Sequence, residues 1–239
     1  LDKQKQIAKN AEELANQKSK EIEEIASQLS KYLSPQLYNS IFSGEKKVSI
    51  ESEKKFLTVF FSDIISFTEI SDQMDSAPLT EMLNLYLTKM SEIALSFGGT
   101  IDKYIGDSIM IFFGDPESEG KEKDAINCVK MAIDMQNTMK TLSKIFMKDF
   151  NLPYPLNMRV GINSGECTVG NFGSEKRLDY TVIGGAVNLA SRLESNSPAG
   201  KILISDVTEK LVKADINCQK YDQIRAKGIN EPINTFIPN

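Results

Sequence analysis

The sequence contains no histidine and only three cysteines. Without histidine, the chain cannot build a Ser-His-Asp or Cys-His nucleophilic site, or a metal site that needs imidazole ligands. Cys128, Cys167 and Cys218 lie far apart and form no Cys-x-x-Cys pair, which favours a reducing, cytoplasmic location. An enzyme built from this chain must therefore rely on carboxylates, lysine, arginine and a hard metal ion.

Long apolar runs and a positive charge balance are also lacking. No apolar run reaches the roughly 18 residues that a transmembrane helix needs, and we expect no signal peptide. The net charge of −5 gives no support for a nucleic-acid partner. The composition is that of an ordinary globular protein of one domain plus an accessory element. Because the first residue is Leu1, we expect a piece of a longer protein, with room for an upstream sensor or membrane domain.

Residues 1–33 are rich in Lys, Glu, Gln and Ala and contain no Gly or Pro. A heptad frame runs along them, tight in its second half and weak at Gln4 and Lys18. Ile7 and Leu14 fall outside this frame, so a competing register stays open. We predict a coiled-coil helix that pairs in parallel with a second copy of the chain; the alternative is a single solvated helix.

The pattern changes after this helix. Ser34-Pro35 breaks it and can start a short new one, so residues 34–53 are interpreted as a helical lead-in and linker. From residue 54 to residue 239, short apolar strands alternate with amphipathic helices, which indicates one globular domain.

The elements of this domain can be placed from periodicity and turn residues. We predict strands over 56–61, 100–105, 108–113, 156–163, 167–171 and 201–204, helices over 77–97, 120–147 and 185–195, and terminal strands ending near residue 236. Hairpin turns are predicted at Gly106-Asp107 and at Ser164-Gly165. This order predicts an α+β fold with a ferredoxin-like (palm-like) antiparallel sheet covered by helices.

Two aspartates end up side by side in this arrangement. Asp63 follows a buried strand, and Asp107 lies at the tip of the predicted hairpin beside that strand. Carboxylates from adjacent strands form the oxygen-ligand site that magnesium prefers. Alternatives stay open for each residue alone, because Asp63 could be a helix N-cap and Gly106-Asp107 could be ordinary turn chemistry.

Three other polar residues stand out. Lys103 lies in a strand that is otherwise apolar, so its ammonium group either has a functional role or extends outward to solvent. Asn188 and Arg192 are four residues apart and share one helix face, where an amide and a guanidinium can bind a polyanion. Taken alone, this helix could equally be a surface helix that carries an arginine.

Four motifs together resemble the class III nucleotide cyclases over about residues 54–238. They are Phe-x-Asp-Ile-x-x-Phe-Thr at 61–68, Lys-x-x-Gly-Asp at 103–107, Arg-Val-Gly-Ile-Asn-x-Gly at 159–165 and Val-Asn-x-Ala-Ser-Arg at 187–192.

The resemblance implies a role for each matching residue. Asp63 and Asp107, with the carbonyl of Ile64, would bind two Mg²⁺ or Mn²⁺ ions. The substrate-binding residues would be Lys103 and Thr181, which read the adenine edge, together with Phe67, Thr68 and the phosphate-binding Lys227. Asn188 and Arg192 would orient the ribose and stabilise the transition state. The family forms a head-to-tail homodimer in which one protomer supplies the metal ligands and the other supplies Lys103, Thr181, Asn188, Arg192 and Lys227.

The base-reading pair favours ATP over GTP. Many family members carry Asp where Thr181 stands, but a threonine hydroxyl can also accept a hydrogen bond, as in the subclass that includes cyanobacterial and bicarbonate-responsive adenylate cyclases. Guanylate cyclases typically carry Glu at the position of Lys103, whereas lysine can donate to adenine N1. We predict an adenylate cyclase that converts ATP to 3′,5′-cyclic AMP and pyrophosphate by two-metal in-line transfer. The alternatives are a guanylate cyclase or an inactive cyclase-like dimerisation or nucleotide-sensing module.

Overall fold

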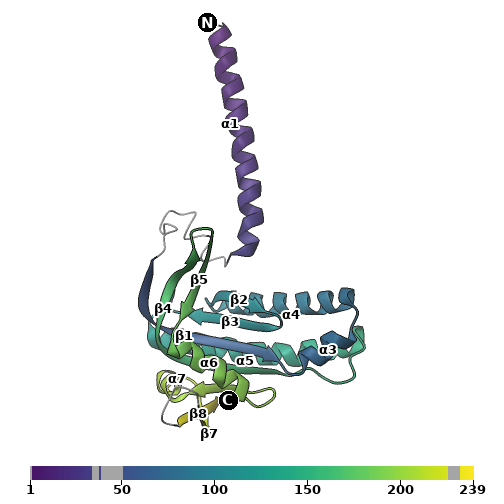
Figure 1. Cartoon of the computed structure of the whole chain (residues 1–239), viewed down its shortest axis with the longest axis vertical. Coiled ribbons are helices and arrows are strands. Elements are labelled where there is room, and N and C mark those ends of the chain that lie inside the picture. The colour runs from purple at the N-terminus through teal and green to yellow at the C-terminus, as the bar shows by residue number, and fades with distance from the viewer. Residues whose placement is uncertain (1, 34–37, 39–50, 226–231) are drawn as a thin grey trace. The chain divides into compact units, whose positions relative to one another are not determined.

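The structure is a computed structural model that describes residues 2–33, 38, 51–225 and 232–239 (Figure 1). The chain divides into two units, Leu1–Lys47 and Val48–Asn239. Among the described residues, no helix is long and apolar enough to cross a lipid bilayer.

In residues 2–33 of the first unit, the long helix α1 (Asp2–Leu29) continues into a short 3-10 helix, η1 (Ser30–Tyr32). Most of its large apolar side chains are exposed: Ile22, Ile25 and Leu29 are 65%, 58% and 55% exposed. The predicted helix is therefore confirmed, and its pairing with a second copy stays a prediction. The predicted linker helix after Ser34-Pro35 falls almost entirely outside the described residues.

In the described residues of the second unit, eight strands form one sheet with helices on both faces. The strands are β1 (Ser52–Ile64), β2 (Thr100–Ile105), β3 (Ser108–Phe113), β4 (Met158–Ser174), β5 (Arg177–Ile183), β6 (Ile202–Ser205), β7 (Cys218–Ile224) and β8 (Ile233–Pro238). The helices are α3 (Phe67–Gln73), α4 (Ser76–Ser96), α5 (Lys121–Asp149), α6 (Gly185–Asn196) and α7 (Asp206–Val212).

The strand order is β2-β3-β1-β4-β6-β8-β7, with β5 paired to β4. All neighbours are antiparallel except β4 and β6, which are parallel. The segment β1-α4-β2-β3-α5-β4 has the connectivity and strand order of the ferredoxin-like motif. The predicted fold class is therefore confirmed.

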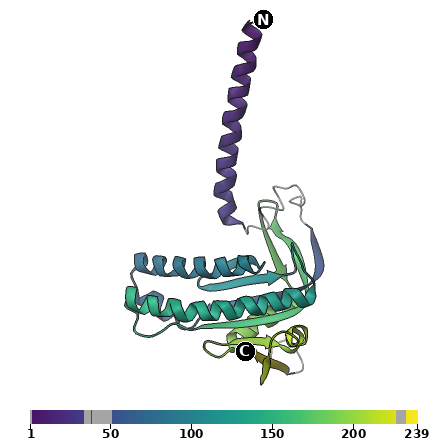
Figure 2. The same cartoon turned by 180° about the vertical axis from the view of Figure 1, so that it is seen from behind.

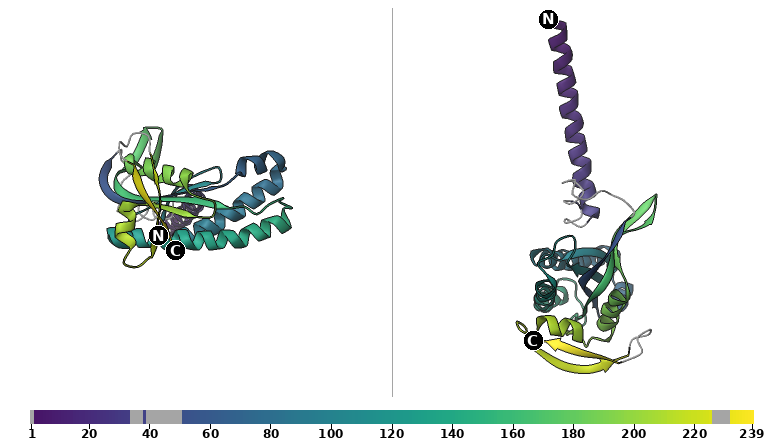
Figure 3. Two further views of the ribbon diagram at one scale, coloured as in Figure 1. Left: turned by 90° about the horizontal axis from the view of Figure 1, so that it is seen from below. Right: turned by 90° about the vertical axis from the view of Figure 1, so that its left-hand side faces the viewer.

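Strand β3 is apolar almost throughout because both faces of the sheet are covered. Ile109 and Ile111 pack into a core shared with α4 and α5, whereas Met110 and Phe112 pack into a second core shared with α6. Figure 2 shows α4 and α5 side by side on one face, and Figure 3 shows α6 on the other face and the β7–β8 hairpin at the end of the sheet. Helix α6 is thus held against the sheet on the face opposite the main helical layer.

The predicted hairpin turn at Ser164-Gly165 is wrong, because β4 runs straight through both residues. Ser164 is buried, and its hydroxyl lies 2.8 Å from the hydroxyl of Thr58 on β1. A side chain at Gly165 would place its Cβ 2.9 Å from Cβ of Ala186 in α6. The small polar pair therefore serves close packing inside a long strand and does not make a turn.

Candidate active site

Asp63 and Asp107 come together at the end of strand β1. Asp63 is the penultimate residue of β1. Asp107 lies in the turn between β2 and β3, and β3 is the strand that pairs with β1. The backbone N–H of Ile64 donates to Oδ2 of Asp107 over 2.8 Å. The two carboxyl groups are close enough to interact directly. The turn at Gly106-Asp107 and the strand end at Asp63 thus form one acidic centre.

The Asp63 carboxylate is held from two sides. Ser108 Oγ donates to its Oδ1 over 2.7 Å, and Arg159 Nη2 donates to its Oδ2 over 2.8 Å. Arg159 Nε in turn lies 2.6 Å from Oε1 of Glu194 in α6. Ser108, Arg159 and Glu194 had no predicted role. The contact between Arg159 and Asp63 depends on the pairing of two strands that lie far apart in the chain.

Burial and the neighbouring carboxylate shift the titration of Asp107. The pKa of Asp107 is raised to about 6, mainly by burial and further by the neighbouring charge of Asp63, against the hydrogen bond from the Ile64 N–H. Partial burial lowers the pKa of Arg159, but the carboxylates of Glu194 and Asp63 outweigh it and the net shift is upward. An additional cation beside the two aspartates would relieve their repulsion.

The donor set fits magnesium bound together with a phosphorylated substrate. Both aspartates supply hard oxygen ligands, and the described residues hold no cluster of three or more Asp, Glu, His or Cys side chains that could form a closed cage. Magnesium is typically held by one or two carboxylates and completes its shell with water and substrate phosphates. The pair Asp63 and Asp107 matches that pattern.

A second polar cluster joins Lys103 to Thr181. Thr181 Oγ1 donates to Oδ2 of Asp102 over 2.5 Å, and Lys103 Nζ lies 3.4 Å from Oδ1 of the same carboxylate. Burial raises the pKa of Asp102, against the hydrogen bond from Thr181 and the charge of Lys103. The structure thus brings two predicted base-reading residues together through a third residue, which the sequence analysis left without a role.

Helix α6 presents Asn188 and Arg192 away from the protein core. Asn188 is exposed and Arg192 is half-buried, while Ala190 and Leu193 are fully buried beneath them. Neither Asn188 nor Arg192 has a side-chain hydrogen bond or ion pair to another described residue. Both side chains are thus left available to a ligand or to another chain.

A glycine sets the position of this helix. A Cβ at Gly161 of β4 would lie 2.0 Å from the backbone nitrogen of Glu194 and 2.4 Å from the carbonyl oxygen of Ala190. The backbones of α6 and β4 can therefore approach this closely only because residue 161 has no side chain.

The remaining predicted residues are less informative. Phe67 begins α3 and packs against the main core, and Thr68 beside it is exposed. The side chain of Ser66 makes no capping hydrogen bond at the start of α3. Lys227 lies outside the described residues.

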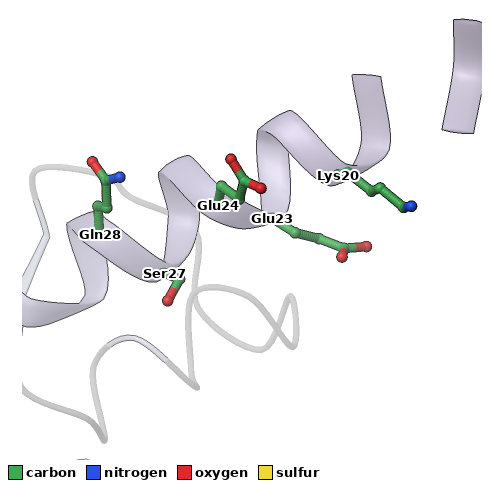
Figure 4. A pocket seen from close by; sticks show the side chains of 5 residues that line it. All are labelled: Lys20, Glu23, Glu24, Ser27 and Gln28. Atoms are coloured by element: carbon green, nitrogen blue, oxygen red, sulfur yellow. The ribbon is translucent and has the colours of Figure 1, made fainter. Parts of the chain in front are cut away.

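Two surface hollows lie apart from these residues. One is lined by Lys20, Glu23, Glu24, Ser27 and Gln28, which are all exposed residues of α1 (Figure 4). The other, of about 240 Å³, lies between α5 and the segment 155–158. Neither includes Asp63, Asp107, Lys103, Thr181 or Arg192. These two hollows therefore do not mark the predicted site.

Comparison with known families gives a match over most of the second unit. Residues 50–239 match the model of the adenylate and guanylate cyclase catalytic domain. The adenylate cyclase, terminal-differentiation specific, of Dictyostelium discoideum is 36% identical over 187 residues, which cover 76% of this chain. The matched part is only 8% of that protein, so this chain spans a small fraction of its length.

Solved structures of both nucleotide classes share this fold. The adenylyl cyclase CyaB from P. aeruginosa is 51% identical, with a TM-score of 0.77 over 79% of this chain and 96% of that one. The guanylyl cyclase Cya2 is 33% identical, with a TM-score of 0.73 over 78% of this chain and 93% of that one. Similarity of the whole fold therefore does not separate ATP from GTP as the substrate.

Proposed function

Because this chain belongs to the family of adenylate and guanylate cyclase catalytic domains, we propose that it converts ATP into 3′,5′-cyclic AMP and pyrophosphate. The observation that carries this proposal is the pairing of Asp63 and Asp107, two interacting carboxyl groups whose only close cationic side chain is Arg159 among the described residues. Such a centre suits a divalent cation that arrives with a triphosphate.

Asp63, Asp107 and the carbonyl of Ile64 would hold two Mg²⁺ or Mn²⁺ ions. When bound, these ions would supply Lewis acidity that lowers the pKa of the ribose 3′-hydroxyl and neutralises the phosphates. The protein's own contribution is to fix the ligands: the Ile64 N–H holds Asp107, while Ser108 and Arg159 hold Asp63. These hydrogen bonds hold both carboxyl groups in place at the end of β1.

Cationic and polar side chains would handle the charge that develops on the phosphates. Arg192 and Lys227 neutralise it, and Asn188 orients the ribose. Phe67 and Thr68, next to the metal ligands in the chain, would line the substrate side of the centre. Since Asn188 and Arg192 face away from their own core, we propose that they serve the active site of a second protomer in a head-to-tail homodimer.

ATP is favoured over GTP by the residues that would read the base. Lys103 can only donate a hydrogen bond, and adenine offers an acceptor at N1. The 51% identical adenylyl cyclase supports this choice, and the 33% identical guanylyl cyclase makes GTP the alternative substrate. A module that binds nucleotide without turnover is the remaining alternative.

The N-terminal helix would pair in parallel with its copy and pass signals from an upstream domain into the cyclase dimer. Its exposed apolar residues Ile22, Ile25 and Leu29 are the natural contacts of such a pair. A change in register or crossing of the two helices would then alter the dimer interface. We place the catalytic unit in the cytoplasm.

A direct assay tests the function. The purified chain is incubated with ATP or GTP, with Mg²⁺ or Mn²⁺, and cyclic nucleotide and pyrophosphate are both measured. We expect equal amounts of cyclic AMP and pyrophosphate from ATP, and little product from GTP. Cyclic GMP as the main product would replace the proposal with a guanylate cyclase. Nucleotide binding without any product would leave only the binding module.

A further inference from the structure

Asp102 is the extra residue of a β-bulge in strand β2. Along the β2–β3 pair, Ile101 lies opposite Ile111 and Lys103 lies opposite Met110, so Asp102 has no partner of its own. In a regular strand, neighbouring side chains point to opposite faces. The bulge breaks this alternation, and the carboxylate of Asp102 and the ammonium of Lys103 lie only 3.4 Å apart.

The groups that face this carboxylate are all hydrogen-bond donors. The Thr181 hydroxyl donates to Oδ2 over 2.5 Å, the backbone N–H of Val182 also donates to the carboxylate, and the Lys103 ammonium lies beside Oδ1. The Asp102 side chain is 1% exposed, and Thr181 is 8% exposed. Little water can therefore replace these contacts.

The contact with Asp102 fixes the direction of the Thr181 hydrogen bond. A threonine hydroxyl has one hydrogen and two lone pairs, so it can either donate or accept towards a ligand. An ionised carboxylate can only accept. With its single hydrogen directed at Asp102, Thr181 can offer only lone pairs to any other partner. Lys103 beside it can only donate.

We propose that Asp102 is a positioning residue that determines nucleotide specificity, because it makes Thr181 a permanent acceptor beside the donor Lys103. This inference rests on the proposed function, in which these two residues read the base. Adenine presents an amino donor at C6 next to the acceptor N1, which complements an acceptor–donor pair. Guanine presents the acceptor O6 next to a protonated N1, which opposes the same pair at both positions.

The isosteric substitution Asp102→Asn tests this role. One carboxylate oxygen becomes an NH₂ group that must face a donor. The Val182 N–H and the Lys103 ammonium cannot accept, whereas the Thr181 hydroxyl can turn round, accept from the amide and donate to the ligand. Thr181 would then match O6 of guanine. We expect the ratio of kcat/KM for ATP to kcat/KM for GTP to fall by about tenfold or more, the size of one reversed hydrogen bond.

A second substitution should reverse the effect. In Asp102→Asn/Thr181→Asp, the amide of residue 102 donates to the new carboxylate, whose free oxygen accepts from adenine. We expect this double variant to regain the ATP preference. A variant that only restored side-chain packing at this position would not regain it, because it would supply no hydrogen-bond acceptor. Asp102→Ala also frees the Thr181 hydroxyl and should lower the ratio even if the asparagine variant does not fold. Asp134→Asn, an exposed position on α5, removes the same charge and should leave the ratio unchanged.

The outcomes separate two failures. If the wild-type chain converts ATP and folded Asp102→Asn and Asp102→Ala variants keep the wild-type ratio, Asp102 does not set specificity, although the proposed cyclase function stands. If the wild-type chain cyclises neither nucleotide, the proposed function and the role of Asp102 both fall. Thermal melting of each variant shows whether the measured ratios come from folded protein.

Discussion

Arg159 lies directly opposite Asp63 in the pairing of β1 with β4, and its Nη2 donates to Oδ2 of Asp63 over 2.8 Å. The same guanidinium lies 2.6 Å from Glu194, which is buried in α6. Arg159 therefore ties a proposed metal ligand on the sheet to the helix that carries Arg192. A substitution of Arg159 should disturb both the proposed metal ligand Asp63 and the position of helix α6.

Replacement of Arg159 by methionine should weaken the fold. The loss leaves the Glu194 carboxylate, whose side chain is 10% exposed, without its cationic partner. We expect the free energy of unfolding to fall by about 1–3 kcal/mol, measured by urea denaturation. The double variant Arg159→Met/Glu194→Gln should recover part of this loss, because the unpaired charge is gone. Strictly additive effects of the two changes would contradict the coupling.

Gly161→Ala should displace helix α6. The new methyl group would lie 2.0 Å from the backbone of Glu194, so the helix must move or the fold must strain. We expect a destabilisation of about 1–3 kcal/mol and a lower kcat, since Asn188 and Arg192 move with the helix. Gly185→Ala is the stability control, because nothing lies within 4 Å of its added Cβ. Equal melting temperatures for both variants would refute this packing argument.

Metal affinity should depend on pH through Asp107. Its pKa in the metal-free fold is raised from 3.8 to about 6, mainly by burial. Because the folded state holds this proton more tightly than the unfolded state, Asp107 lowers the stability of the metal-free fold as pH rises from about 4 to about 6. A bound cation needs the charged form.

Stabilisation by Mn²⁺ should therefore fade as the pH drops through about 6, which thermal shift titrations between pH 5 and pH 8 can measure. Asp107→Asn should show little Mn²⁺ stabilisation at any pH. A Mn²⁺ shift in wild type that stays constant down to pH 5 would contradict the assignment of Asp107 as a metal ligand.

Local signals made part of this structure predictable from sequence. The dipeptide Gly106-Asp107 specifies its hairpin turn, and the apolar run of β3 specifies a strand buried on both faces. The proximity of Asp63 and Asp107 could be predicted from these signals, because a hairpin next to β1 brings Asp107 to the end of that strand. The spacing of Asn188 and Arg192 alone was enough to place them on one helix face.

The remaining contacts of the site could not be predicted, because they depend on pairing between strands that are distant in the sequence. The partners of Asp63 and Thr181 depend on strand pairing between distant segments. The motif at 159–165 therefore singled out Arg159 without showing its contact with Asp63, and nothing local singled out Asp102. The continuous course of β4 was missed because Ser164-Gly165 has turn chemistry. The alternation of polar and apolar residues over 177–182 is a strand signal for β5 that the prediction did not use.

Loss of one proposed catalytic group should stop or slow turnover in different ways. Asp107→Ala removes a metal ligand and should abolish product formation. Arg192→Ala removes a contact to the transition state and should lower kcat by a factor on the order of 10²–10³, with a smaller effect on KM. Near-normal kcat in either folded variant would remove that residue from the mechanism.

The most direct test of the account is to mix the Asp107→Ala and Arg192→Ala proteins. If one protomer supplies Asp63 and Asp107 and its partner supplies Asn188 and Arg192, each mixed dimer contains one intact site and one doubly damaged site. Statistical mixing should then restore about a quarter of the wild-type rate of cyclic AMP formation. A mixture that exchanges subunits and yet stays as inactive as its two components would show that the active site is not shared between protomers.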